Sequence, residues 1–241
     1  MTGTILNFIT VVAGAVTGKL IGERLPPRMR ETVMHVIALV TLVIGADMAL
    51  KTRNPLVLLL SLVLGAVVGE LLRVEDGINR LGELAERRLS REGNGDFARG
   101  FITTSILFCV GPMTLLGCLN DGLRGDYRLL AIKSTLDGIS AIAFASALGW
   151  GVLLSALTVL LVQGTLSLGA HALAPLLSDP AGQAELFAAG GVMMLGLGLR
   201  ILELKPIRVG NLLPALLFAP LLVAGLKALA RAHLLPPGLN P

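Results

Sequence analysis

Long apolar segments follow one another along almost the whole chain, and they constrain the fold more than any other feature. A helix needs about 20 apolar residues to cross a bilayer. Eight segments approach that length, near 3–22, 32–50, 55–73, 101–120, 129–148, 151–175, 185–203 and 210–229. The chain is 54% hydrophobic and 15% charged, whereas soluble domains carry roughly 25% charged residues. We therefore predict an all-α fold, a polytopic transmembrane helical bundle of about eight spans that forms one integral membrane domain over 1–241.

The net charge of +4 does not indicate a nucleic-acid partner. Lysine and arginine are concentrated in the short gaps between apolar segments, where such residues orient membrane proteins. If the N-terminus lies outside, the cytoplasmic gaps hold more of these residues than the outer gaps and the C-terminal tail do. We therefore expect both termini outside, the lipid bilayer as the main partner of the chain, and no nucleic acid.

The most polar stretch, 74–98, separates the third and fourth apolar segments. Val74, Ile78, Leu81 and Leu89 recur in it at helical spacing, and charged residues fill the other positions. This pattern is typical of an amphipathic helix on the cytoplasmic membrane surface. It also fits a solvated connector that only joins two halves of the protein, and both interpretations stay open.

The fifth segment places two opposite charges inside an apolar helix. Lys133 and Asp137 are four residues apart, so they share one helical face, which Ser140 extends. If the helix begins at Leu129, Asp137 lies about 12 Å along it, near the middle of the hydrocarbon. A charge at that depth costs at least about 2.5–3.5 kcal/mol on the insertion scale. Such a carboxylate is a candidate site for a cation or a proton, and an ion pair that only fixes helix packing is the alternative.

The fourth segment contains Gly111 and Pro112 at mid-length. Proline removes a backbone hydrogen bond and kinks a helix, and freed carbonyl groups are tolerated at membrane depth only where they meet protein or a cavity. Transporters use a broken helix beside a charged one to bind ions, whereas a kink that serves only shape is the alternative. Further polar candidates for this site are Ser134, Thr114, Asn7, Asn120 and Asp121.

Glycines recur every four residues in the first and third segments. They are Gly14, Gly18 and Gly22 in the first segment, and Gly65 and Gly69 in the third. Small residues at this spacing let a second helix approach closely, so we expect helix-packing faces here. The neighbour could belong to the same chain or to another subunit, and the sequence therefore leaves a homo-oligomer open.

Two apolar hairpins, 37–65 and 190–220, share a sequence pattern. Each has a glycine near the end of a span, a charged residue two positions later, a basic gap, an asparagine and a second span. The charged residue is Asp47 in the first hairpin and Arg200 in the second. An odd offset in spans makes the copies cross in opposite directions, as in the inverted repeats of many transporters. The pattern predicts an inverted repeat that relates spans 1–3 to spans 6–8, with chance similarity as the alternative.

Motifs of common enzyme chemistry do not occur in the sequence. We find no Walker loop, zinc motif or nucleophile elbow. Cys109 and Cys118 are nine residues apart in one segment, which would place them on opposite faces of a helix. We therefore expect no disulfide, no metal, no cofactor and no enzymatic activity.

Two motifs lie close together in the fourth and fifth segments: G-x-L-N-D-G-L-x-G-D over 117–126 and K-S-x-L-D-G-x-x-A over 133–141. With 24-RLPPRMR-30, 69-GELLRVEDGINR-80 and 211-NLLPALL-217, they make the chain resemble the YqgA/YdfK-like bacterial inner-membrane family over nearly its whole length. The resemblance implies a multi-pass protein of the bacterial inner (plasma) membrane and no settled substrate or activity. It supports the fourth and fifth segments as the functional centre and assigns no role to any residue. The motif residues are Asn120, Asp121, Gly122, Asp126, Lys133, Ser134 and Asp137.

Together these features predict a transporter of a small solute or ion. Its site would lie between the kinked fourth segment and the Lys133–Asp137 face, where Asp137 binds a cation or cycles a proton and Lys133 sets its charge state. A non-transporting scaffold, sensor or assembly partner is the main alternative, and it predicts a fully enclosed ion pair. An ion channel is a third interpretation, and it predicts a continuous polar path.

Overall fold

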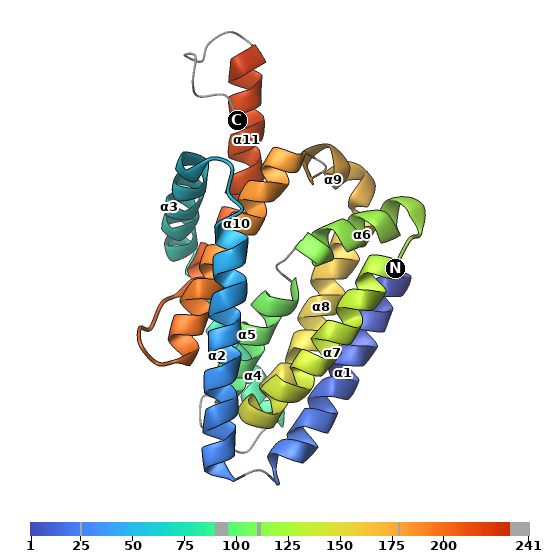
Figure 1. Ribbon diagram of the computed structural model, residues 1–241, viewed down its shortest axis with the longest axis vertical. Helices are drawn as coiled ribbons and strands as arrows, with labels where there is room; N and C mark the ends of the chain where they lie inside the picture. Colours follow the sequence, from blue (N-terminus) through green and yellow to red (C-terminus); the bar gives the residue numbers. More distant parts are fainter. Residues whose placement is uncertain (25, 90–95, 110–111, 178, 232–241) are drawn as a thin grey trace.

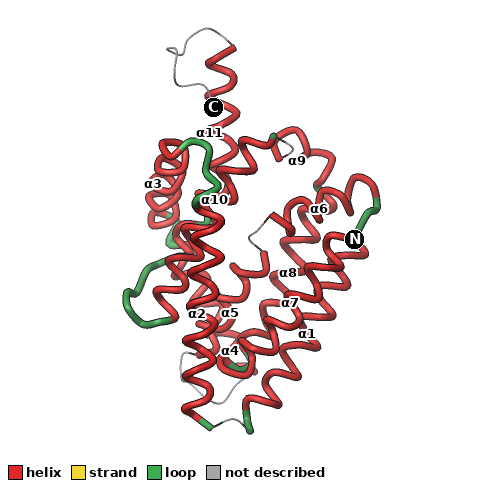
Figure 2. The backbone as a smooth tube through the Cα atoms, in the orientation of Figure 1, coloured by secondary structure: helices red, strands yellow, loops and turns green. Residues whose placement is uncertain are grey.

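The computed structural model describes residues 1–24, 26–89, 96–109, 112–177 and 179–231. Over these ranges the chain is a bundle of helices without a strand (Figure 1 and Figure 2), which confirms the all-α fold. The elements are α1 (Thr2–Gly22), α2 (Pro27–Ala49), α3 (Pro55–Leu71), α4 (Val74–Leu89), α5 (Asp96–Cys109), α6 (Pro112–Arg124), α7 (Arg128–Leu148), α8 (Gly151–Leu168), α9 (Ala170–Leu177), α10 (Pro180–Ile201), the 3-10 helix η1 (Val209–Leu212) and α11 (Ala215–Arg231).

Six helical stretches of the described residues are long and apolar enough to cross a membrane: α1, α2, α7, α8, α10 and Val209–Ala230, which includes η1 and α11. Two pairs of helices qualify only together, because each is bent at a short break. They are Pro55–Leu71 with Val74–Arg80, bent by 55°, and Phe97–Cys109 with Met113–Arg124, bent by 59°. Counting each pair as one span gives eight, so six to eight helices could span the membrane.

Large apolar side chains cover the outer faces of several helices. Val43 on α2, Leu59 on α3 and Ile139 on α7 are each more than half exposed. Soluble monomers rarely expose contiguous apolar patches of this extent, whereas lipid tails are as apolar as leucine side chains. The outer surface is therefore suited to a bilayer. The main core lies inside, where α1, α5, α7, α8 and α10 contribute buried apolar side chains.

Prolines and polar caps determine where several helices begin. Pro27, Pro55 and Pro180 occupy the first turns of α2, α3 and α10, where an N–H group would have no partner within the helix. Asn54 accepts hydrogen bonds from two N–H groups of the first turn of α3. Gly149 follows α7 with φ +72°, a conformation that glycine adopts more readily than other residues, and it allows the tight turn into α8.

The fourth predicted segment, 101–120, is formed by two helices with a break next to Pro112, where the sequence predicted a kinked or broken helix. α5 ends at Cys109, α6 begins at Pro112, and the two helices are bent by 59°. Proline fits the first turn of a new helix and disfavours helical backbone at the residue before it, which accounts for the break. Cys109 and Cys118 consequently lie on different helices, and both thiols are free. Gly111 lies outside the described residues.

Two other predicted segments also differ from the helices that form. The segment 151–175 is divided, because α8 ends at Leu168 and α9 begins at Ala170. The polar stretch 74–98 contains α4. The first turn of α4 packs against the rest of the protein, unlike that of a connector surrounded by solvent. Glu75 in that turn is buried, and its backbone N–H donates to Oδ1 of Asn211 at 2.7 Å. The beginning of α4 is therefore packed against η1.

Glycines bring α1 and α7 into backbone contact. A Cβ at Gly14, Gly18 or Gly22 would collide with a backbone carbonyl group of α7. These contacts advance in the same direction along both helices, which therefore run parallel. Gly65 and Gly69 on α3 lie equally close to the backbone of α11 and η1. All these neighbours belong to the same chain, so the glycine faces do not require a second subunit.

The packing of α2 against α10 follows a reciprocal pattern. Gly45 on α2 lies against the backbone of α10, and Gly198 on α10 lies against α2. The partners of Gly45 are Gly191 and Leu195, and those of Gly198 are Ala38 and Leu42. One shift therefore relates the two contacts: Gly45 with Gly198, Ala38 with Gly191 and Leu42 with Leu195 are each 153 residues apart.

Candidate functional site

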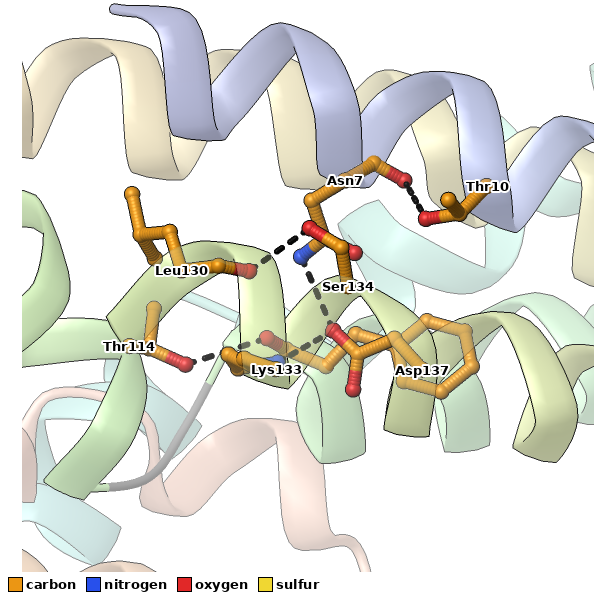
Figure 3. A network of polar contacts seen from close by, with 8 residues as sticks. Asn7, Thr10, Thr114, Leu130, Lys133, Ser134 and Asp137 are labelled. Atoms are coloured by element: carbon orange, nitrogen blue, oxygen red, sulfur yellow. Dashed lines mark hydrogen bonds and ion pairs between the residues drawn. The ribbon is translucent and has the colours of Figure 1, made fainter. Parts of the chain in front are cut away.

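Lys133 and Asp137 form a buried ion pair on α7 (Figure 3). Lys133 is 6% exposed and Asp137 is 8% exposed. The ammonium group contacts Oδ2 of the carboxylate. The same oxygen accepts a hydrogen bond of 2.9 Å from Nδ2 of Asn7 on α1. Three predicted site residues are thus in contact, although Asn7 is 130 positions from Asp137 in the sequence.

Asn7 reaches Asp137 because α1 and α7 pack closely at this level. Gly138 follows Asp137 on α7, and its missing side chain leaves room for Thr10 of α1, which a Cβ would meet at 3.3 Å. The hydroxyl of Thr10 donates to the backbone oxygen of Asn7 at 3.0 Å. Ser134 donates its hydroxyl to a backbone oxygen of its own helix at 2.7 Å. Ser134 therefore lies beside the ion pair without a hydrogen bond to it.

A cavity of about 440 Å³ lies beside the ion pair. Side chains of α2, α5, α6, α7 and α10 line it, and most of them are apolar. This arrangement brings five polar side chains to one cavity from three helices that are separated in the sequence. They are Lys133, Asp137 and Ser140 on α7, Thr114 on α6 and Thr41 on α2.

The cavity opens at the outer surface between α2 and α7. Val36 and Val40 on α2, together with Leu136 and Ile139 on α7, line it and are each more than half exposed. These side chains continue the apolar surface that suits a bilayer. The ion pair therefore lines a cavity whose opening is bordered by exposed apolar side chains.

The end of α5 and the beginning of α6 border the same cavity. Leu107 near the end of α5 and Met113 near the beginning of α6 both line it. Thr114 bridges the two helices, because its hydroxyl donates to the backbone oxygen of Phe108 at 3.2 Å (Figure 3). One carbonyl group near the break is therefore satisfied by a side chain, as is required at membrane depth.

Two predicted site residues lie elsewhere. Asp121 is buried, and its Oδ2 contacts the N-terminal ammonium of Met1 at 2.9 Å and accepts the N–H of Gly3 at 3.1 Å. It thereby fixes the beginning of α1. Asn120 is half-buried and does not line the cavity. Asp121 does not line the cavity either.

Gln163 on α8 is a buried polar residue that the predicted site did not include. It is 0% exposed, and neither polar atom of its side-chain amide has a hydrogen-bond partner among the described residues. Oδ1 of Asn7 is buried and likewise has no partner within the described part of the chain. An unsatisfied buried polar group costs about 1–3 kcal/mol. The signal in the sequence was a glutamine in a long apolar segment, without an obvious partner nearby.

Carboxylates at both ends of the bundle accept hydrogen bonds from backbone N–H groups of the loops between helices. Glu185 on α10 accepts the backbone N–H groups of Arg53 and Asn54 at 2.7 and 2.8 Å. Glu75 on α4 accepts the N–H of Gly210 at 2.6 Å and pairs with Arg200. These bonds stabilise the fold and do not form a further site. Among the described residues, no group of three or more His, Cys, Asp or Glu side chains could hold a metal ion.

Comparison with known proteins identifies the family. The model described as "Protein of unknown function (DUF554)" matches residues 2–224. "Uncharacterized protein YqgA" of Escherichia coli (strain K12) is 35% identical over 221 residues, which cover 90% of this chain and 94% of that protein. "Uncharacterized membrane protein YdfK" of Bacillus subtilis (strain 168) is 28% identical over 227 residues, covering 92% and 96%. No solved structure matches this chain. With matches over almost its whole length, the chain belongs to the DUF554 family, a family of membrane proteins, and six to eight of its helices could span a membrane.

Proposed function

We propose that the protein transports a small solute or ion and that Lys133 and Asp137 contact the transported species. The observation that carries this proposal is the position of a buried ion pair on the wall of a cavity of about 440 Å³. Charged side chains within membrane spans are costly and generally mark solute or ion pathways. A scaffold would be expected to enclose the ion pair fully, and a channel would be expected to have a more continuous polar lining than this cavity has.

The break between α5 and α6 supports the same proposal. Discontinuous helices contribute substrate and ion sites in many transporters, because the break exposes backbone groups and helix ends at membrane depth. Here both sides of the break border the cavity that contains the ion pair. The break is therefore a place where the cavity could change shape as the solute moves.

Reciprocal packing supports an inverted repeat of spans 1–3 and 6–8. The contacts of Gly45 with α10 and of Gly198 with α2 exchange under one sequence shift, as a twofold axis in the membrane plane requires. The counterpart of α3 is α11, and these two helices also pack against each other. Thr4 on α1 and Ser167 on α8 contact each other at 3.5 Å. Each helix of the first triplet thus contacts its proposed counterpart, which suits alternating access by rocking of one half against the other.

The hydrogen bond from Asn7 suggests how the site exchanges partners. Lys133 has a flexible side chain and can move away when a cation, a proton or a donor group of the solute reaches Asp137. Asp137 then keeps its bond to Asn7, which lowers the cost of separating the pair. Lys133 in turn becomes available to an acceptor group of the solute.

The distribution of charge suggests an orientation in a bacterial inner (plasma) membrane. Arg99, Arg200 and Arg208 form ion pairs close to α4 or to the loop before η1. Basic residues favour the cytoplasmic side. We therefore place α4 in the cytoplasm and the N-terminus outside.

Uptake into proteoliposomes tests the proposal. The panel consists of radiolabelled amino acids, organic acids and monovalent cations, with an enclosed pH-sensitive dye for protons. We expect Asp137→Asn and Lys133→Ala to abolish the flux that the native protein supports. The matched controls are Asp47→Asn and Lys51→Ala, which alter an exposed pair with the same spacing and an N–O distance of 2.5 Å. Equal flux in all four variants, or no flux with any member of the panel, would contradict the proposal.

A further inference from the structure

The cavity is much larger than a bare ion requires. Its volume is about 440 Å³, and a water molecule takes up about 30 Å³ in the liquid, so the space is equivalent to roughly 15 waters. Cavities that bind organic ligands have volumes of about 300–1,000 Å³. Provided that the proposed transport function holds, the size favours an organic solute.

The lining indicates an amphiphile that reaches the cavity from the bilayer. The opening is bordered by exposed apolar side chains, of which Ile139 is 63% exposed. Phe144 and Met194 continue the apolar lining inside, and Lys133 and Asp137 occupy the inner wall. A solute with an apolar chain and one polar end matches this distribution, because its chain can stay in apolar surroundings while the polar end meets the pair.

The charges of the site favour a polar end without net charge. Lys133 and Asp137 neutralise each other, so a permanently charged headgroup would leave one charge uncompensated where burial makes that costly. The two side chains still offer hydrogen-bonding capacity. A lysine ammonium has three donors, and the described residues accept one of them, at Oδ2 of Asp137. Both hydrogen bonds to Asp137 within the described part of the chain reach Oδ2, which leaves Oδ1 available as an acceptor.

We propose that the cavity binds a single-chain carboxylic acid, which enters from the bilayer in its undissociated form. The acid O–H donates to Oδ1 of Asp137, and the acid carbonyl accepts from the ammonium of Lys133. If the acid O–H bond breaks, its proton forms a new O–H bond on Asp137, and the resulting carboxylate pairs with Lys133. The net charge stays at zero in both forms, so the acid anion and the proton move together.

The test is photolabelling of the native protein in lipid nanodiscs, followed by mass-spectrometric mapping of the adducts. The probe is dodecanoic acid with a diazirine in its chain. Its methyl ester, which cannot donate, and a dodecyl-trimethylammonium analogue serve as headgroup controls. We expect adducts of the acid on the α2 and α7 segments that contain Val40 and Ile139. Labelling by the ester should be weaker by roughly tenfold or more, as for the loss of one hydrogen bond to a charged group.

Two variants on one face of the bundle test the location. Val40→Trp should block labelling, because Val40 borders the cavity. Val43→Trp is the control on the same helix, since Val43 is 70% exposed and does not line the cavity. Circular dichroism and gel filtration verify that both variants fold. Equal labelling by the three headgroups, or equal labelling of the two variants, would overturn the inference. Labelling without flux would contradict the transport proposal and support the acid-binding site. Flux of water-soluble solutes without labelling would support transport and contradict the acid-binding site.

Discussion

Removal of Lys133 should destabilise the protein far more than removal of an equivalent exposed lysine. Lys133→Met keeps most of the side-chain volume and leaves the carboxylate of Asp137 in a site where it is 8% exposed. Breaking a buried ion pair by loss of one partner costs about 3–5 kcal/mol. The remaining hydrogen bond from Asn7 at 2.9 Å offsets part of that penalty, so we expect a loss of about 3 kcal/mol.

Lys51→Met is the matched comparison. Asp47 on α2 and Lys51 just after the end of α2 have the same i,i+4 spacing, yet both are well exposed, and such pairs contribute about 0–1 kcal/mol. The free energy of unfolding is measured by reversible SDS titration in mixed micelles. The double variant Lys133→Met/Asp137→Asn should be more stable than Lys133→Met alone, because it no longer leaves an unpaired buried charge.

Two results would refute this reasoning. If Lys133→Met and Lys51→Met lower the free energy of unfolding by the same amount, the Lys133–Asp137 pair is not in surroundings of low polarity. If the double variant is less stable than Lys133→Met by the full cost of Asp137→Asn, the two side chains act independently, and the contact does not contribute.

Three further expectations follow from named contacts. Gln163→Met should raise the free energy of unfolding by about 1–3 kcal/mol, since it removes a buried amide that has no partner among the described residues; unchanged or lower stability in SDS titration would contradict this. Gly18→Ala should cost about 1–3 kcal/mol through its collision with α7, whereas a Cβ at Gly225 would meet no neighbouring atom of the described residues within 4 Å, so Gly225→Ala should stabilise α11 by about 0.5–1 kcal/mol; SDS titration in which both variants behave alike would contradict this. The hydrogen bond from Lys227 lowers the pKa of Asp179, so its contribution to stability is present above the unfolded pKa of about 3.9 and is lost as the pH falls through the lower folded pKa. Lys227→Met should therefore reduce the loss of thermal stability between about pH 4 and pH 2, and unchanged acid sensitivity would contradict that assignment.

Local sequence patterns predicted the fold class and the part of the candidate site that lies on α7. The length of the apolar segments implies helices that span a bilayer, and the i,i+4 spacing of Lys133 and Asp137 implies contact on one face. Both depend on residues close together in the chain. Glycines at every fourth position in α1 likewise predict close packing, although they do not say which helix is the neighbour.

Contacts between distant segments could not be predicted in this way. The bond from Asn7 to Asp137 requires α1 to lie parallel to α7, and sequence spacing within either helix carries no information on that register. Asp121 contacts the N-terminal ammonium of Met1, and the spacing of residues within α6 does not reveal that contact. Gln163 was visible as a polar residue in an apolar segment, but its unpartnered amide became evident only when its neighbours were placed.

The proposed transport requires the transported species to interact with Asp137. Infrared difference spectroscopy on the reconstituted protein tests this interaction, by comparison of the carboxyl bands with and without the solute that the uptake assay identifies. We expect a solute-induced change in a carboxyl or carboxylate band that disappears in Asp137→Asn and persists in Asp47→Asn. Identical difference spectra in the native protein and both variants would contradict it.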